Sequence, residues 1–553
     1  MPAYVAKPFP YRTPPELAGV DRGIHPVVIV GAGPIGLAAA IDLALQGVRV
    51  IVIDDNDVVS VGSRAICWSK RSLEILDRLG VGDRYVEKGF TWKVGRVHHR
   101  DRFLYSFDLL PEGGHKMPAF VNLQQYYAEE YLVDRCADFP DLIDLRWKNE
   151  FVALQRHDDH VRIEVQTPDG RYSLSTQWLI AADGARSAVR SALGLKFEGR
   201  TFEEKFLIAD VRWADAPNER NFWFQPSFDP SESVLIHRQA DNISRIDFQI
   251  GWDADTTTEL QPEKIAERVR RVVGDDVPFE LDWCSIYTFR CVRMERFVHG
   301  RVIFAGDSAH VVSPFGARGG NGGLQDVDNL CWKLARVIHG QAPRSLLDSY
   351  DEERGHGCDE NIMHSSRTTR FMTPKTPVER DFRDGVLALA PEFPFARALV
   401  NSGRLSKPCS LQGLPYITPD SAPMSGDMVP GSPCDDAPML DRDGRPRWLL
   451  NSLGNEFCVL VFDRDNAAAE RYRKILREAG LAARLVLVLP AQVSATDSDA
   501  LTDQQGLAQE RYGGEAGVTY LIRPDQHVAA RFPGFDVNAI GRAYARALRG
   551  VSS

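Results

Sequence analysis

The chain has 553 residues, of which 44% are hydrophobic and 26% charged, with a formal net charge of -10 at pH 7. This length exceeds what one hydrophobic core usually serves, so we expect two or three domains. The acidic balance and the lack of a basic run argue against nucleic-acid binding.

Targeting signals and cysteine spacing bear on where the protein works. Residues 1–23 are polar and rich in proline, without the apolar core and cleavage site of a signal peptide. No run of eighteen apolar residues occurs, so no membrane span is expected. Nine cysteines are scattered without a CxxC pair, which favours reduced thiols over disulfides or a zinc site. We therefore expect a cytoplasmic protein.

Residues 26–54 predict a strand, a turn, a helix and a second strand: "PVVIV", "GAGPIG", "LAAAIDLALQG" and "VRVIVID". In the GxGxxG turn, the first glycine makes the tight turn, the second admits a pyrophosphate and the third lets helix and strand pack closely. An acid ends the second strand, where it can bind ribose hydroxyls. A dinucleotide is thus expected at this turn, with contacts from Gly31, Gly33, Pro34, Gly36, Asp54 and Asp55.

Two later strands also end in glycine–aspartate pairs. The stretch "TQWLIAADGARSAVRSALG" reaches Asp183 and Gly184 before a helix, and "GRVIFAGDSAH" ends at Gly306 and Asp307. Each pair alone is typical of an ordinary strand-end turn. The order GxGxxG, then DG, then GD along one chain is far more specific.

The segment from about 200 to 290 predicts an antiparallel sheet laid over the nucleotide domain. The runs "SVLIHRQ" and "ISRIDFQIGW" alternate polar and apolar residues and are joined by a turn. In the second run the polar side chains of Arg245, Asp247 and Gln249 are expected on one face and the apolar ones on the other.

Five glycines, Gly316, Gly319, Gly320, Gly322 and Gly323, precede a predicted helix. They leave backbone N–H groups bare at the positive end of the helix dipole, which favours an electron-rich or anionic ligand. Farther on, residues 340–400 predict helices, 406–447 are linker-like in composition, and the strands and helices beyond predict a third, small α/β domain.

The order of these motifs resembles that of the flavin-dependent aromatic hydroxylases, single-component monooxygenases similar to para-hydroxybenzoate hydroxylase. The 3-(3-hydroxyphenyl)propionate hydroxylase-like branch shares stretches such as "HRQADN", "RIDFQ" and "SPFGARG". The likeness covers roughly residues 26–400, and the C-terminal domain resembles a thioredoxin-like appendage. The fold class so implied is α/β, with a Rossmann-like, doubly wound FAD-binding sheet, a middle antiparallel β substrate domain and a C-terminal thioredoxin-like domain. The implied boundaries are 1–200 with 290–400, then 201–289, a linker at 401–447, and 448–553.

The resemblance also implies how FAD is held. The GxGxxG turn and Asp54 would bind its adenosine half, Asp183 and Gly184 would lie near the pyrophosphate and the coenzyme path, and Asp307 would bind the ribityl chain. The remaining implied cofactor contacts are Arg64, Gln125, Gly306, Gly319, Gly320 and Asn321.

The family reaction implied is reduction of FAD by NADH or NADPH, formation of a flavin hydroperoxide with O2, and hydroxylation of a phenol. Pro314 would wall the flavin ring. Arg318 stands where many relatives have glutamine, and would favour the reduced flavin anion or hold a substrate carboxylate or phenolate. His237, whose charge changes near neutral pH, is a candidate to share the phenolic proton, and Tyr287 is a second candidate.

Other interpretations stay open at this point. An FAD-dependent oxidase, a ring-modifying oxygenase and a regulatory flavin-binding module without turnover fit the same scaffold, whereas the WxWxIP motif of flavin halogenases is not found. The expected partners are a small aromatic substrate and O2, with no nucleic acid and no membrane, and a homodimer is considered. The choice between NADH and NADPH, and the substrate itself, stay open.

Overall fold

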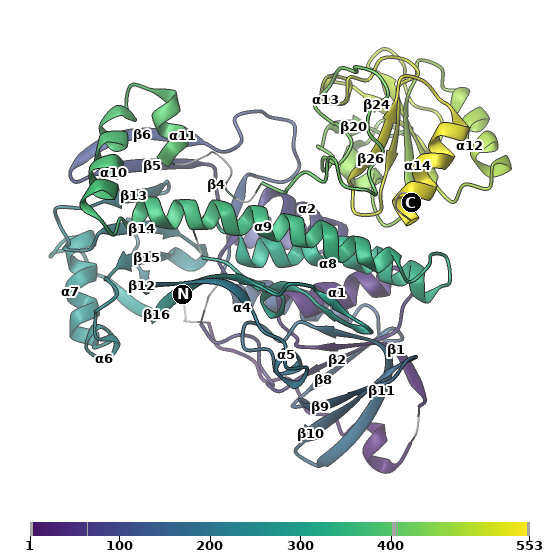
Figure 1. Ribbon diagram of the computed structural model, residues 1–553. Coiled ribbons are helices and arrows are strands. Elements are labelled where there is room, and N and C mark those ends of the chain that lie inside the picture. The colour runs from purple at the N-terminus through teal and green to yellow at the C-terminus, as the bar shows by residue number, and fades with distance from the viewer. Residues whose placement is uncertain are drawn as a thin grey trace.

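A computed structural model describes residues 4–20, 22–62, 65–313, 315–400, 405 and 407–549. Three large sheets and two long helices organise the chain (Figure 1). The helices α8 (Gly319–Ile338) and α9 (Leu346–Met372) lie between a parallel sheet, a middle antiparallel sheet and a C-terminal sheet. The mixed α/β fold predicted from the sequence is confirmed.

The parallel sheet has the order β17-β18-β11-β1-β2-β8, with the hairpin strands β9 and β10 extending β11. β1 pairs in parallel with both β2 and β11, which makes it a central strand. Its last four residues are all buried because both faces of the sheet are covered, so they show no polar–apolar alternation. The strands are β1 (Ile24–Val30), β2 (Val50–Asp54), β8 (Ile143–Trp147), β9 (Glu150–Arg156), β10 (Val161–Thr167), β11 (Gly170–Ala181), β17 (Val298–His299) and β18 (Val302–Phe304).

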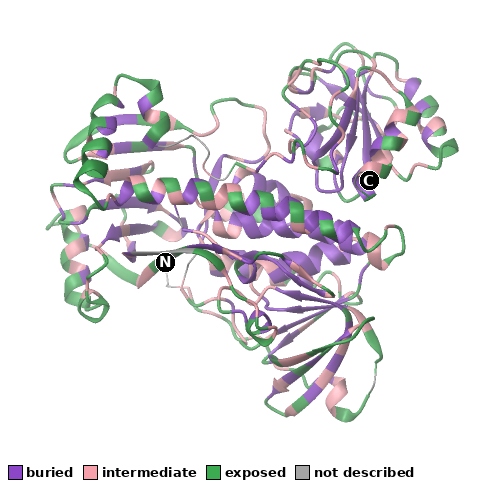
Figure 2. Ribbon diagram, viewed as in Figure 1, coloured by how far each residue is buried: buried purple, intermediate pink, exposed green. Residues whose placement is uncertain are grey.

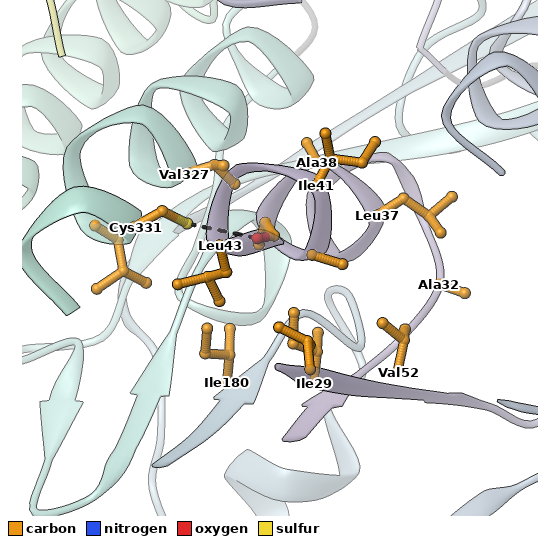
Figure 3. Packing of buried hydrophobic residues seen from close by; sticks show 14 of the residues in the cluster. Ile29, Ala32, Leu37, Ala38, Ile41, Leu43, Val52, Ile180, Val327 and Cys331 are labelled. Carbon is orange, nitrogen blue, oxygen red and sulfur yellow. Dashed lines mark hydrogen bonds between the residues drawn. The ribbon is translucent and has the colours of Figure 1, made fainter. Parts of the chain in front are cut away.

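Helix α1 (Pro34–Leu45) packs between this sheet and α8 (Figure 3). Its small side chains Ala38, Ala39 and Ala40 are buried and allow α8 to come close to its backbone. The closeness is visible in the contact of 3.8 Å between the Cys331 sulfur and the Ala39 carbonyl oxygen. The same packing fixes the start of α8 near the glycine turn that begins α1.

The middle sheet has eight strands in the order β19-β16-β12-β15-β14-β13-β5-β6. Two of them, β5 and β6, come from residues before the predicted middle segment of 201–289 and close one edge of the sheet. Its strands are β5 (Val94–His99), β6 (Arg102–Asp108), β12 (Glu198–Arg212), β13 (Arg220–Phe224), β14 (Ser233–Arg238), β15 (Ile243–Gln249), β16 (Glu280–Arg293) and β19 (His310–Val311).

The two faces of the middle sheet differ in polarity. Ile246 and Phe248 are buried against Ile265 and Val269 of α7 (Pro262–Val273). The opposite face, which carries His237 and Asp247, turns instead toward Cys67 at the start of β3. This orientation explains why one strand can carry buried charges.

A small sheet and eight further α-helices precede the C-terminal domain in the part of the chain that the structure describes. A three-stranded sheet of order β3-β7-β4 lies beside α2 and α8. Its strands are β3 (Cys67–Ser69), β4 (Phe90–Trp92) and β7 (Phe120–Asn122). The helices are α2 (Lys70–Arg78), α3 (Gly82–Lys88), α4 (Gln125–Cys136), α5 (Ala188–Ala192), α6 (Thr256–Glu259), α7 (Pro262–Val273), α10 (Pro377–Leu389) and α11 (Pro394–Val400).

The C-terminal sheet has the order β21-β20-β24-β23-β22-β25-β26, and its central strands are buried in Figure 2. β20 lies inside the segment 401–447, which the sequence predicted as a linker, and β21 begins there. The strands are β20 (Pro438–Leu440), β21 (Pro446–Trp448), β22 (Cys458–Phe462), β23 (Arg484–Pro490), β24 (Ala500–Asp503), β25 (Thr519–Ile522) and β26 (Val528–Phe532), and the helices α12 (Ala468–Glu478), α13 (Leu507–Tyr512) and α14 (Val537–Arg549).

A buried ionic contact joins the C-terminal domain to α9. Arg523 donates to both carboxylate oxygens of Glu353, at 2.6 and 2.8 Å. Both side chains are almost fully buried, and Lys333 and Asp525 extend the pair into a buried ionic network. Among the helices that the structure describes, none has the length and apolar character needed to span a bilayer.

Candidate functional site

The three glycines of the turn before α1 meet different surroundings. A Cβ atom on Gly36 would lie 1.9 Å from the Gly31 carbonyl oxygen, and one on Gly31 would lie 2.5 Å from the Ala182 carbonyl oxygen. These two glycines are therefore required by the packing of the protein itself. A Cβ atom on Gly33 would meet no atom within 4 Å. The second glycine of the motif thus borders open space, as a pyrophosphate-binding position must.

Asp54, at the end of β2, holds the glycine turn. Its Oδ2 accepts a hydrogen bond of 2.6 Å from the Ala32 N–H, and its Oδ1 accepts one of 2.9 Å from the Asn56 N–H. Burial raises the pKa of this carboxyl group. The neighbouring Asp55 accepts from the Asn56 side chain at 2.8 Å. Asp54 therefore ties β2 to the turn that follows β1, beside the open space at Gly33.

The N-termini of α1 and α8 are both left without a side-chain cap. Gly33 is the N-cap of α1, and Pro34 is its first residue. Arg318 is the N-cap of α8, and no acid lies in the first turn of either helix. Uncapped N–H groups at the positive ends of two helices suit a ligand with phosphates or another electron-rich group.

The Gly306–Asp307 pair is anchored to α8 through Asp326. The Gly306 N–H donates to Asp326 Oδ2 at 2.9 Å, and His310 and Arg354 contact the same carboxylate at 2.6 and 2.7 Å. Although burial alone would raise the pKa of Asp326, these two partners lower it to about 2. Asp307 itself is exposed between two buried neighbours. The chain therefore holds the backbone firmly and turns the Asp307 side chain outward.

The Asp183–Gly184 pair forms a turn at the end of β11. Asp183 Oδ2 accepts from the Val189 N–H at 3.1 Å, and burial raises the pKa of this carboxyl group. Gly184 has a φ of 75°, and a Cβ on it would meet no atom within 4 Å. The acid accepts from the first turn of α5, whose N-cap is Ser187, while the glycine supplies the left-handed turn.

Gln125 holds the segment that precedes β3. Its Oε1 accepts from the Ala65 N–H at 3.1 Å, and its Nε2 donates to Ser60 Oγ at 3.1 Å and Glu129 Oε1 at 2.7 Å. Burial raises the pKa of Glu129, which also accepts from the Ser60 N–H. This network fixes residues on both sides of Arg64, which itself lies outside the described residues.

The glycine-rich segment reaches α8 through strained backbone. Gly316 has a φ of 90° and Ala317 a φ of 53°. A Cβ on Gly320 would lie 3.6 Å from Ala65, and one on Gly319 would have only one contact, at 4.0 Å. The predicted residues Gly319 and Gly320 therefore begin α8 next to the segment that Gln125 holds. Pro314 lies outside the described residues.

Asn321, in the first turn of α8, has a structural use for its side chain. Its Nδ2 donates to the Cys67 carbonyl oxygen at 2.8 Å, and its Oδ1 accepts from the Ser69 N–H at 3.0 Å. Arg318 is buried, and its Nη1 donates to Asn361 Oδ1 at 2.9 Å. Both side chains thus stabilise the start of α8 through hydrogen bonds to neighbouring segments.

Apolar contacts join the middle sheet to the start of α8. Phe206 packs edge-on against Phe315, with ring centroids 5.1 Å apart, and Tyr287 packs against the same cluster. A Cβ on Gly62 would lie 2.4 Å from the Trp283 indole nitrogen. The polar face of the sheet and the segment before β3 therefore lie against each other.

A row of polar residues crosses this face of the sheet. His237 lies opposite Arg245, and Arg245 lies opposite Asp210. Arg245 donates two hydrogen bonds of 2.8 Å to the Asp210 carboxylate, so this buried pair is satisfied. The pair holds β15 and β12 in register on the polar face.

His237 does not titrate near neutral pH, so the charge change for which it was proposed from the sequence does not occur there. Burial and the nearby Arg220 lower the pKa of His237 to about 4, against the effect of Asp247. Its Nδ1 lies 3.8 Å from the Cys67 sulfur, and its Nε2 lies 3.7 Å from Asp247 Oδ2. The neutral imidazole can still donate or accept a hydrogen bond at this place.

Two residues of the same face were missed as candidates. Asp247 was placed only as a sheet residue, and Arg220 was not considered. The signal for Arg220 was its place at the start of the aromatic run "RNFWF", where an apolar strand begins with a charge. Its position beside His237 depends on strand pairing, which the sequence alone does not specify.

The residues present fit an FAD molecule. Gly33 borders open space, α1 and α8 begin without side-chain caps, and Asp307 is turned outward from a buried strand end. These features lie at the carboxyl ends of parallel strands, where open α/β sheets bind ligands.

Comparisons with known families give the same result. Residues 25–365 match the family described as FAD binding domain, and residues 438–547 match the HcaD C-terminal domain. The family resemblance drawn from the order of the three glycine motifs is thereby confirmed.

Relatives match over nearly the whole chain. A 3-(3-hydroxy-phenyl)propionate/3-hydroxycinnamic acid hydroxylase from Burkholderia vietnamiensis is 28% identical over 95% of this chain and 96% of its own length. A 6-methylpretetramide 4-monooxygenase from Streptomyces rimosus is 30% identical over 94% and 92%. The crystal structure of the flavin-dependent monooxygenase PieE, in complex with FAD and substrate, is similar with a TM-score of 0.79 at 21% identity, over 96% of this chain and 100% of that one.

Proposed function

Since the chain belongs to the FAD binding domain family and is an FAD-dependent monooxygenase, we propose that it hydroxylates a phenolic aromatic compound with NADH or NADPH and O2. The observation that carries the proposal is the packing of the polar face of the middle sheet against β3, which is bonded to the start of α8. Aromatic and polar side chains come together there, next to the elements that fit FAD. A phenol likewise combines an aromatic ring with a polar hydroxyl group.

FAD, when bound, supplies the redox chemistry: it takes a hydride from the coenzyme and activates O2. In the proposed arrangement Gly31, Gly33, Pro34 and Gly36 would bind the pyrophosphate region, and Asp54 with Asp55 the adenosine side. Asp183, Gly306 and Asp307 would bind the middle of the molecule. Gly319, Gly320 and Asn321 would bring backbone N–H groups to the ring, with Arg64 and Gln125 on the opposite side.

The protein's own contribution is to position a phenol and to exclude water. The neutral His237 imidazole would hydrogen-bond the phenolic hydroxyl, which makes the ring more electron-rich as its proton is shared. Tyr287, Phe206 and Phe315, which pack in one apolar cluster, would form the apolar wall of the substrate site. Arg318 and Pro314 would border the flavin side of the substrate.

The coarse organisation supports three functional parts. We propose that residues 1–200 and 290–400 bind FAD, that 201–289 cover the substrate, and that 448–553 form an appended thioredoxin-like domain after the segment 401–447. All nine cysteines are free thiols, which supports a reducing compartment such as the cytoplasm. A homodimer stays a prediction that sedimentation or light scattering can test.

The experiment is a screen of phenols for stimulated coenzyme consumption. The purified, FAD-loaded protein is mixed with NADH or NADPH in air, and single phenols are added in turn. Stimulation with a hydroxylated product supports the proposal. Stimulation with hydrogen peroxide as the sole product would favour an oxidase, and no stimulation by any aromatic, with FAD fully bound, would favour a regulatory module.

A further inference from the structure

Arg220 is a half-buried cation on the polar face of the middle sheet, and one nitrogen of its guanidinium lacks an acceptor. Its Nη1 is buried and has no hydrogen-bond partner among the described residues. Burial lowers the pKa of Arg220, although Cys67 and Asp247 oppose the shift. A buried guanidinium without acceptors is costly, so proteins normally pair it.

The strand register places Arg220 beside the proposed substrate position. Asn221 pairs with Ile236, and the antiparallel register therefore puts Arg220 across from His237 on the same face. His237 in turn contacts Cys67, whose carbonyl oxygen receives the Asn321 side chain from the first turn of α8. Arg220 is thus a strand neighbour of His237, which is linked through Cys67 to the helix that would face the flavin.

Neighbouring acids do not satisfy Arg220. Asp210 is fully used by Arg245, through two hydrogen bonds of 2.8 Å. Asp247 makes no hydrogen bond to Arg220, and its own Oδ1 is buried without a partner. The charge of Asp247 acts to raise the pKa of Arg220, but it supplies no acceptor to the guanidinium.

An aromatic platform lies under the same guanidinium. The Arg220 Cζ atom is 5.3 Å from the centroid of the Trp92 ring, and Trp92 is held by a hydrogen bond of 2.8 Å to Asn122. Trp92 belongs to an apolar cluster that includes Cys67 and Ala317, the residue that precedes Arg318. A planar cation stacked on a fixed ring is preorganised to receive two oxygens of one anionic group.

We infer that Arg220 binds an oxyanion of the aromatic substrate and thereby sets which phenols the enzyme accepts. This inference rests on the proposed function. The oxyanion is either a carboxylate carried by the substrate or the phenolate oxygen itself, and both supply the negatively charged acceptor that the guanidinium lacks. Arg220 is a specificity residue in this account.

The first arm of the test compares an acid with its neutral analogue. Binding of 3-(3-hydroxyphenyl)propionate and of its primary amide to the FAD-loaded protein is measured from the change in flavin absorbance. If the oxyanion is a carboxylate, the wild type binds the acid roughly tenfold or more tightly than the amide, and Arg220→Gln reduces this ratio to about 1. Arg220→Lys keeps the positive charge but lacks the paired N–H donors of the guanidinium. It therefore retains part of the preference for the acid over the amide.

The second arm tests the phenolate with 4-nitrophenol, whose ionised form absorbs visible light. If the oxyanion is the phenolate, the bound phenol ionises at a lower pH in the wild type than in Arg220→Gln. The matched control is Arg238→Gln, because Arg238 is the next residue after His237 and bonds the exposed Asn218 side chain at the end of β14. Arg238→Gln should leave the acid-to-amide binding ratio and the ionisation pH of bound 4-nitrophenol as in the wild type.

Folding and function are monitored separately. Arg220→Gln removes a cation without a partner, so its thermal midpoint and FAD content do not fall below those of the wild type. The inference is overturned if the wild type and Arg220→Gln have the same acid-to-amide ratio and the same ionisation pH for bound 4-nitrophenol. Coupled hydroxylation of a neutral phenol by Arg220→Gln would keep the proposed function intact in that event.

Discussion

The Asn321 side chain joins the first turn of α8 to Cys67 of β3, donating a hydrogen bond of 2.8 Å to the Cys67 carbonyl oxygen. The same amide accepts from the Ser69 N–H at 3.0 Å. One buried side chain therefore aligns the helix that would face the flavin with the strand that lies beneath His237. Removing this side chain should therefore lower the free energy of unfolding.

Asn321→Ala is expected to destabilise the protein by about 2 kcal/mol, because it leaves a buried carbonyl and a buried N–H without partners. FAD affinity should fall as well, since the start of α8 loses its tie to β3. Chemical denaturation and fluorescence of released FAD measure the two effects. Asn451→Ala is the control, because Asn451 is exposed and bonds Asp77 at the surface. Equal stability of both variants would contradict the structural use assigned to Asn321.

Gly33→Val should give folded protein that is purified without FAD. The open space at Gly33 accepts a side chain in the protein alone, but the valine would occupy the room that the pyrophosphate needs. The absorbance ratio of flavin to protein measures the loss. Gly385→Val, in α10, is a matched control because a Cβ there also meets no atom within 4 Å. Stoichiometric yellow FAD in Gly33→Val would refute the cofactor position.

The pKa of His237 predicts a pH dependence of stability. Its folded-state pKa is lowered to about 4, so between pH 6.5 and pH 4 the unfolded chain binds a proton that the folded chain does not. Stability therefore falls as the pH drops through this window. Relative to His237→Gln, the wild type should lose about 3 kcal/mol more between these two pH values. Parallel pH profiles of unfolding free energy for the two proteins would disprove the buried neutral state.

The cysteines of the C-terminal domain are expected to have no redox part in turnover. Cys434 and Cys458 are both buried, and burial raises the pKa of the Cys434 thiol to about 12. Such thiols are poor nucleophiles. The double variant Cys434→Ser, Cys458→Ser should keep the rate of coenzyme oxidation within about twofold of the wild type. A lost rate with FAD bound and the fold intact, judged by circular dichroism, would show that the thiols take part.

The sequence predicted the parts of the fold that local pattern determines. The GxGxxG turn, its strand and its helix follow from spacing, and Asp54 and Asp307 follow from the ends of strands. Contacts between segments far apart in the sequence could not be predicted from local pattern. The strands β5 and β6 join the middle sheet from a different part of the chain, and β20 and β21 arise within a proline-rich and glycine-rich segment.

The candidate site divides in the same way. From the sequence, His237 was a candidate because its charge changes near neutral pH, but burial and Arg220 lower its pKa to about 4 through tertiary packing. Arg220 itself becomes visible only once β13 pairs with β14. Sequence patterns show which face a residue is on, whereas charge states depend on neighbours across strands.

The measurement that tests the central claim most directly counts oxygen, coenzyme, hydrogen peroxide and product together under isotopically labelled O2. A monooxygenase holds a phenol in a closed region and transfers one oxygen atom to it, so the best phenol of the screen should give close to one hydroxylated product per coenzyme consumed. The product should carry the label, and little peroxide should form. If every stimulating aromatic yields peroxide in proportion to coenzyme and no label enters the ring, the protein does not hydroxylate aromatic rings.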